Sequence, residues 1–132
     1  MRAFYDAIKQ EVTMNLNSII DSVKKHPDYK KTGMILCHNG VVRSTSRDGR
    51  QVSGLRVAVD HEKLRNVITE NKKRPGIVEI LVEIAEDKDL AIGEDVMFLV
   101  VAGDIRDNVI EALKHTLDDI KTTVTAKTEF FV

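Results

Sequence analysis

Hydrophobic residues are most concentrated in the last third of the chain. Residues 96–102 read Val-Met-Phe-Leu-Val-Val-Ala, a run short enough and rich enough in β-branched residues to predict a strand buried on both faces. Gly103 ends this run, and Asp104 stands where a helix N-cap belongs. Apolar residues then recur at helical spacing down to Lys121, at Ile105, Val109, Leu113, Leu117 and Ile120. Residues 122–132 return to β-branched and aromatic residues, which predicts a closing strand.

Two shorter amphipathic segments earlier in the chain predict further helices. One follows Asn15, has apolar residues at helical spacing, and is stopped by His26-Pro27. The other follows Asp60 as its N-cap and ends before Pro75-Gly76. Residues 1–14 fit either a helix or an extended lead-in, and the pattern leaves that choice open.

Short apolar runs between these helices predict the remaining strands. The first covers residues 33–37 and continues past a turn or bulge at Asn39-Gly40, and the second covers 52–59 with a bulge at Gly54. The third, residues 77–84, alternates apolar residues with glutamates, which predicts one solvent-facing side. Residues 44–50 contain no apolar side chain, so we expect a mobile loop that becomes ordered only on an external contact.

The number and order of these elements bound the fold class. Strands interleaved with two or three helices are typical of an α/β or α+β fold, here a mixed sheet with the helices packed on it. A chain of 132 residues with 42% hydrophobic residues suits one domain, so we expect residues 1–132 to form a single unit.

Composition narrows the function classes. The net charge is −1, so no global field favours nucleic acid or an anionic membrane, and any anion site must be local. The single cysteine, Cys37, excludes an internal disulfide, and the four histidines show no metal-ligand spacing. No apolar run approaches 18 residues, and the N-terminus lacks a signal-like apolar core. We therefore expect a cytoplasmic protein.

Four short segments, in this order and at these intervals, resemble the large subunit of molybdopterin synthase. They are Gly40-Val41-Val42-Arg43, Ile92-Gly93-Glu94-Asp95, Asp104-Ile105-Arg106 and the stretch from Lys121 to Lys127. The resemblance covers roughly residues 33–129. It implies an α+β fold of the α/β hammerhead type, in which a flexible loop follows the first strand and a long helix opens with a basic residue.

The resemblance also implies roles for single residues. The family's anion-binding arginine falls on Arg43 and its helix-start arginine on Arg106, so both are expected to bind substrate. Its helix-end catalytic lysine falls on Lys121, and its second catalytic lysine falls on Lys127 if one residue is deleted before it. The departures from the family's pattern are the replacement of histidine or arginine by Ile105, Ala85 and Glu86, of phenylalanine by His38, and the loss of a tryptophan.

The family's reaction moves sulfur from the C-terminal thiocarboxylate of a small ubiquitin-like sulfur-carrier subunit to cyclic pyranopterin monophosphate, in molybdenum cofactor biosynthesis. The resemblance implies that sulfurtransferase activity and those two partners, with no metal or cofactor held by the protein. Cations suit the phosphate, and a lysine can move a proton or form a covalent adduct. Two alternatives stay open: a catalytically degenerate relative that acts as a dimeric protein- or anion-binding module, and an unrelated α/β binding module.

Each site residue also has a simpler interpretation. Arg43 beside a polar loop, Lys121 at a helix C-terminus and Lys127 on a strand are all ordinary surface positions. Arg106 is different, because the helix dipole disfavours a cation in a first turn, which indicates a partner. Arg106 and Lys121 are 15 positions apart on one predicted helix, or roughly 22 Å. A homodimer would let Arg106 of one protomer reach the lysines of the other.

Overall fold

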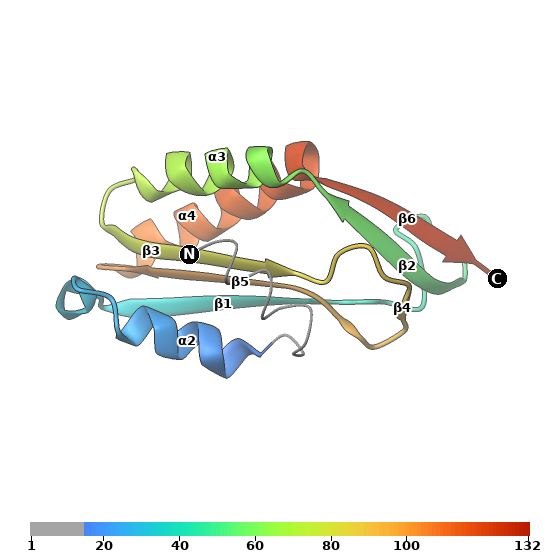
Figure 1. The fold of residues 1–132 in the computed structure, drawn as a ribbon, viewed down its shortest axis with the longest axis horizontal. Helices are drawn as coiled ribbons and strands as arrows, with labels where there is room; N and C mark the ends of the chain where they lie inside the picture. The colour runs from blue at the N-terminus through green and yellow to red at the C-terminus, as the bar shows by residue number, and fades with distance from the viewer. Residues whose placement is uncertain (1–14) are drawn as a thin grey trace.

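The computed structural model describes residues 15–132, which form two antiparallel three-stranded sheets with helices around the larger one (Figure 1). In strand order, the larger sheet contains β1 (Met34–Val41), β5 (Asp95–Gly103) and β3 (Ile77–Ile84). The smaller sheet contains β4 (Leu90–Ala91), β2 (Val52–Val59) and β6 (Thr125–Phe131). The predicted α+β class is confirmed, with the strands divided between two sheets. The open choice at residues 1–14 lies outside the described residues.

Two of the helices begin at the caps that the sequence predicts. In α2 (Leu16–Lys24), the side chain of Asn15 accepts a hydrogen bond from the Ser18 backbone N–H. In α3 (His61–Lys72), the side chain of Asp60 accepts one from the Lys63 backbone N–H. A short 3₁₀ turn, Tyr29–Lys31, connects α2 to β1. Local sequence therefore decides where these two helices start.

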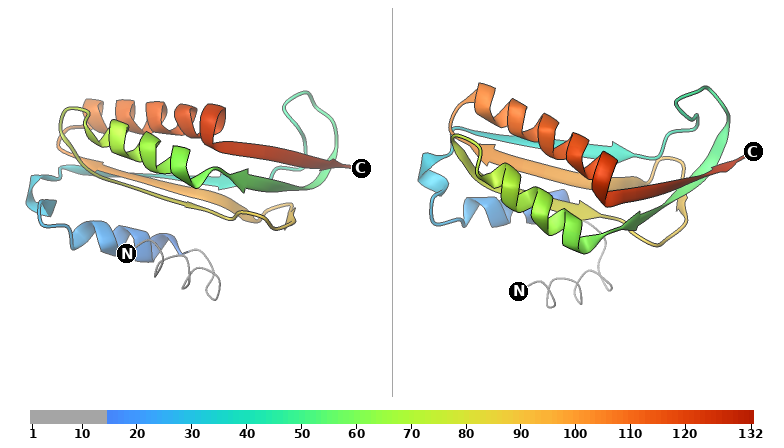
Figure 2. Two further views of the ribbon diagram at one scale, coloured as in Figure 1. Left: turned by 45° about the horizontal axis from the view of Figure 1, so that its top comes forward. Right: turned by 90° about the horizontal axis from the view of Figure 1, so that it is seen from above.

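Strand β5 is the centre of the larger sheet and is buried on both faces, as predicted. Phe98, Val100 and Ala102 pack against Ile19 and Val23 of α2. Leu99 and Val101 face the opposite way and pack against α4. The views in Figure 2 show α2 on one side of this sheet and both α3 and α4 on the other. Successive side chains of β5 therefore point to opposite faces of the sheet and belong to two separate hydrophobic clusters.

The prediction that β3 has a solvent-facing side is wrong. Glu83 is 8% exposed and Glu79 is half-buried. Glu79 forms ion pairs with Lys72 at 2.9 Å and with His26 at 3.8 Å. Charged residues along β3 therefore do not mark a solvated face, because groups distant in sequence supply their partners.

The long helix α4 (Arg106–Asp119) begins one residue later than predicted. Its N-cap is Ile105, whereas Asp104 lies just before the cap and accepts hydrogen bonds from the Ile105 N–H and the Asn108 side chain. The α-helix also stops before Lys121 and continues as one π-helical turn, Ile120–Val124. This wider turn leads directly into β6 and buries both Ile120 and Val124.

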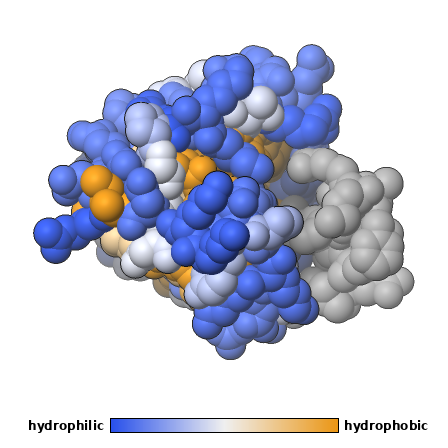
Figure 3. Space-filling model, turned by 90° about the vertical axis from the view of Figure 1, so that its left-hand side faces the viewer, coloured by the Kyte–Doolittle hydropathy of each residue, from blue (hydrophilic) through white to orange (hydrophobic). Residues whose placement is uncertain are grey.

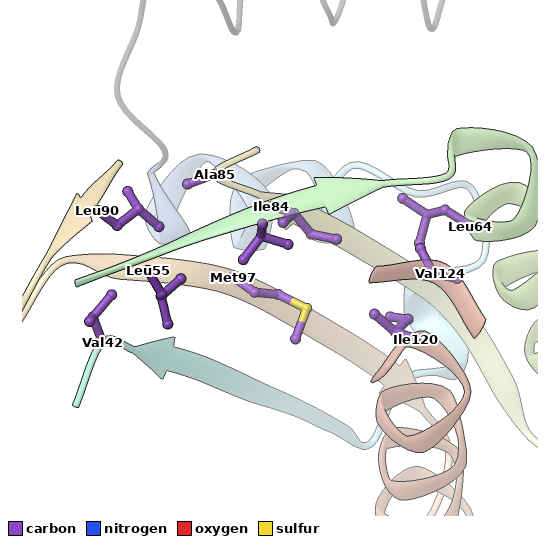
Figure 4. Packing of buried hydrophobic residues seen from close by; sticks show 10 residues of the cluster. Val42, Leu55, Leu64, Ile84, Ala85, Leu90, Met97, Ile120 and Val124 are labelled. Carbon is purple, nitrogen blue, oxygen red and sulfur yellow. The ribbon is translucent and has the colours of Figure 1, made fainter. Parts of the chain in front are cut away.

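The third hydrophobic cluster joins the two sheets, and Figure 4 shows its side chains converging from strands and helix ends. Ile120 and Val124 of the π-helical turn meet Met97 of β5 and Leu55 of β2 there. The predicted bulges are confirmed by register shifts between Gly40 and Val41 and between Val52 and Gly54. This cluster fixes the position of the segment that carries Lys121.

Candidate functional site

Lys121 lies in the π-helical turn between α4 and β6, and its side chain is exposed. The buried residues Ile120 and Val124 on either side anchor the turn in the core. Thr122 and Thr123 donate hydrogen bonds to Asp118 and Asp119 carbonyl oxygens, which satisfies acceptors at the helix end. Single π-helical turns within helices are frequently found at functional sites. The backbone that presents Lys121 is therefore held from both sides.

His38 of β1 is the residue whose ionisation responds to Lys121. Partial burial lowers the pKa of His38, and the positive charge of Lys121 lowers this pKa further. The imidazole is consequently uncharged at neutral pH. An uncharged imidazole offers one N–H donor and one acceptor beside the ammonium group.

Lys127 lies on β6, an edge strand of the smaller sheet. It is paired in register with Val57 of β2, which is buried in the cluster between the sheets. Paired residues in an antiparallel sheet share a face, so Lys127 belongs to the inward face of β6. Its side chain is still 56% exposed, and its ammonium group is 4.0 Å from the Glu129 carboxylate. Lys127 therefore lies at the edge of the core, and its side chain extends into solvent.

Arg43 follows β1 and begins the polar loop. Its Nε donates a hydrogen bond to the Thr45 carbonyl oxygen at 2.9 Å. The loop is closed by a bridge between Thr45 and Gln51 and by hydrogen bonds between Ser46 and Arg50. The Arg50 guanidinium lies 3.6 Å from the ring centroid of Phe131, on β6. The loop carrying Arg43 is therefore attached to the closing strand, while its mobility stays a prediction.

Arg106 begins α4, at the opposite end of the helix from Lys121. Fifteen residues at about 1.5 Å each separate them by roughly 22 Å. Within residues 15–132, Arg106 has no ion pair or side-chain hydrogen bond, so the partner that its first-turn position suggested is not found there. The structure does not bring Arg106 to the lysines of its own chain.

The three positions where the family's histidine or arginine is replaced differ in their surroundings. Ile105 is 56% exposed at the start of α4. On that end of the molecule, apolar surface is confined to small areas between hydrophilic side chains (Figure 3). Ala85 is buried in the cluster between the sheets. Glu86 contacts His61, with 2.6 Å between Oε1 and Nε2. Ala85 therefore contributes to the packing of the core, and Glu86 forms an ion pair with His61 when the histidine is protonated.

The sequence analysis noted His38 only as a replacement of phenylalanine and did not predict that Lys121 would act on it. The available signal was the alternation along β1: Met34 and Leu36 are on the face that packs against α4, and His38 follows on that face. Across residues 15–132, no group of three His, Cys, Asp or Glu side chains is placed to hold a metal ion. No helix in this part of the chain is long and apolar enough to cross a membrane.

The candidate site residues are cations on three segments, together with the uncharged His38 of β1. The charge of Lys121 lowers the pKa of His38, Lys127 follows Lys121 by six residues on β6, and Arg43 follows the strand that carries His38. About 16 Å of strand separates His38 from Arg43 along the chain. Arg43 and the two lysines are groups that can bind an anion, because cationic side chains form charge-assisted hydrogen bonds with anions.

Comparison with known proteins gives a family and a fold. The model of the MoaE protein family matches residues 9–123. Molybdopterin cofactor biosynthesis protein E from Burkholderia multivorans is similar in structure, with 20% identity, a TM-score of 0.72, and coverage of 92% of this chain and 85% of that one. Molybdopterin synthase from Staphylococcus aureus has 20% identity, a TM-score of 0.67 and coverage of 78% and 77%.

A third similar structure is a complex of subunits 1 and 2 of the molybdopterin-converting factor from Helicobacter pylori. It has 17% identity, a TM-score of 0.66, and coverage of 90% of this chain and 84% of that one. A search of curated proteins finds no significant match. At these identities, the solved structures establish the shared fold, and the family model establishes the family.

Proposed function

The chain belongs to the MoaE protein family, and we propose that it is the large subunit of a molybdopterin synthase. In this role it takes sulfur from the thiocarboxylate of a small ubiquitin-like subunit and transfers it to cyclic pyranopterin monophosphate. The observation that carries the proposal is the position of Lys121 on a segment anchored in the core, from which its charge lowers the pKa of the uncharged His38. Similarity to the Helicobacter pylori complex of two subunits supports a small protein partner.

Each cation has a role in this proposal. Lys121 is the catalytic lysine and Lys127 assists it from the inward face of β6. Arg43 binds the phosphate, because a guanidinium group matches phosphate oxygens with two parallel donors. Its present contact is to the Thr45 carbonyl oxygen, which leaves its other N–H donors for a ligand. These assignments rest on matched positions and on the contacts of the three residues.

Substitution of Lys121 tests the proposal directly. We expect Lys121→Ala to abolish sulfur transfer while changing the free energy of unfolding by less than about 0.5 kcal/mol, because an exposed surface lysine contributes little to stability. The assay combines the purified protein, a thiocarboxylated small subunit and cyclic pyranopterin monophosphate. Lys114→Ala is the matched control, since Lys114 is an exposed lysine on α4. Unchanged turnover in Lys121→Ala would remove this residue from the mechanism.

A homodimer completes the proposed site. Arg106 and Lys121 are too far apart within one chain to contact one small substrate, and a two-fold axis would bring Arg106 of one protomer toward Lys121 of the other. Light scattering at micromolar concentration tests the assembly, and a monomer would contradict it.

Mixing two inactive variants tests the shared site. If Arg106 acts across the dimer, combining Arg106→Ala with Lys121→Ala protomers produces mixed dimers with one intact site. Random pairing then restores about a quarter of wild-type turnover. If both residues act within one chain, mixing restores nothing. If subunit exchange is verified and the mixture still shows no turnover, the site is not shared between protomers.

The second candidate function is a catalytically degenerate relative that binds a protein or an anion. The observation that favours it is the contact between Glu86 and His61, at a position where the resemblance has a basic residue. This function predicts that the wild-type protein binds the small subunit but produces no molybdopterin. Turnover by the wild-type protein would exclude it.

A further inference from the structure

Strand β1 and helix α4 run in the same direction along one face of the larger sheet (Figures 1 and 2). Met34 and Leu36 of β1 belong to the cluster that contains Val109, Leu113 and Leu117 of α4. The next residue on that face of β1 is His38, and the next turn after Leu117 contains Lys121. The two periodicities therefore place His38 and Lys121 at the same end of the contact between β1 and α4, where the Lys121 charge lowers the pKa of His38.

The imidazole of His38 has a defined position on this face. An ideal Cβ built on Gly40 would lie 3.4 Å from His38 Nε2. The ring consequently extends along β1 over Gly40, toward the end of the strand where Arg43 follows.

One charged residue in the described part of the chain acts on His38. Among residues 15–132, Lys121 is the titratable group whose charge acts on His38. Its strand neighbour on β5 is Leu99, which is apolar. The adjacent residues Cys37 and Asn39 point to the other face of β1, and the Asn39 side chain donates to Asp95. No described carboxylate therefore competes for His38.

We propose that His38 is a substrate-binding residue of this site, which acts together with Lys121 and hydrogen-bonds the anionic substrate through an uncharged imidazole. This inference rests on the proposed function. The position is occupied by phenylalanine in the pattern that the chain resembles, so the polar ring is a feature of this chain. A carboxylate in its place would neutralise Lys121, whereas an uncharged imidazole adds a hydrogen-bonding group and leaves the ammonium charge for the substrate.

The first test needs no sulfur-transfer assay. In the full-length protein, the imidazole NMR signals of His38 are assigned by their loss in His38→Gln and followed through a pH titration. We expect the His38 pKa to lie below the ordinary value of about 6.5 and to rise in Lys121→Met. Lys114→Met is the matched control and should leave this pKa unchanged. A His38 pKa that is the same in the wild type and in Lys121→Met would overturn the proposal.

The second test uses inorganic phosphate as the anion. Addition of phosphate should shift the His38 signals in a saturable manner in the wild type and in Lys114→Met, but not in Lys121→Met. His115, which contacts Glu111 on α4, is the internal control and should not respond. Absence of a saturable shift at His38 in the wild type would overturn the inference even if the protein is an active synthase.

The third test uses turnover. We expect His38→Phe to raise KM for cyclic pyranopterin monophosphate about tenfold with little change in kcat, which corresponds to the loss of one hydrogen bond. His38→Gln should restore most of the affinity, because its amide also donates and accepts, and should remove the pH dependence contributed by the imidazole. A wild-type KM in His38→Phe would overturn the proposal. An inactive wild type with a saturable phosphate shift would instead refute the synthase function and retain the anion site.

Discussion

Asn71 connects α3 to α4, and its removal should destabilise the fold by a calculable amount. Its side chain is 3% exposed and makes three hydrogen bonds. Its Nδ2 donates to the Val67 carbonyl oxygen at 2.9 Å and to the Asp119 carboxylate at 3.1 Å, and its Oδ1 accepts from Arg74 Nε at 2.9 Å. Each bond contributes about 1 kcal/mol. Alanine recovers about 0.6 kcal/mol through its higher helix propensity.

We therefore expect Asn71→Ala to lower the free energy of unfolding by about 2 kcal/mol, because the loss of three hydrogen bonds outweighs the gain in helix propensity. Urea unfolding followed by circular dichroism should show the midpoint moving down by roughly 1 M. Asn66→Ala is the matched control on the same helix, since Asn66 is exposed and makes no side-chain hydrogen bond within residues 15–132. It should raise the free energy of unfolding by about 0.6 kcal/mol, which is the gain in helix propensity alone.

The contact with Asp119 can be isolated by a double-mutant cycle. Asn71→Ala, Asp119→Ala and the double variant should give a coupling free energy of about 1 kcal/mol, because Asp119 is exposed and water screens part of the interaction. If Asn71→Ala unfolds within 0.5 kcal/mol of the wild type, as judged on the scale of surface substitutions, the reasoning fails. The groups that bond to Asn71 would then be hydrogen-bonded by water in the variant, with no loss of stability.

Two further predictions concern a glycine and a pH dependence. Gly76→Ala should lower the free energy of unfolding in urea by about 2 kcal/mol or more, because Gly76 has a φ of 74° and an added Cβ would collide with the Asp104 carboxylate. Gly49→Ala is the control, since Gly49 has a φ of 88° and open space around it, and it should cost only about 1 kcal/mol. Equal losses in the two variants would contradict the collision. Hydrogen bonds from the Asn108 side chain and the Ile105 N–H lower the pKa of Asp104, so its contribution to stability is present above the ordinary aspartate pKa and is lost as pH falls through the lowered value. Asp104→Asn should therefore flatten the decline in stability between pH 5 and pH 2 in urea titrations, and an unchanged slope would refute this assignment.

Local sequence determined the features that depend on neighbouring residues. Asn15 and Asp60 cap their helices because the side chain of a cap bonds to a backbone N–H three residues later. Gly54 bulges β2, and an added Cβ there would meet the Leu90 carbonyl oxygen of the neighbouring strand. The uninterrupted apolar run of β5 predicted burial on both faces, and two separate clusters confirm it.

Only the tertiary structure decided which residues distant in sequence meet. The burial of Glu83 depends on its neighbours across the sheet, and no period along β3 records them. The effect of the Lys121 charge on the pKa of His38 couples residues far apart in the sequence, since it depends on how β1 and α4 are aligned on one sheet. The division of the strands between two sheets likewise follows from long-range pairing. Capping and periodicity act within a few residues, whereas these contacts form only when the whole core is assembled.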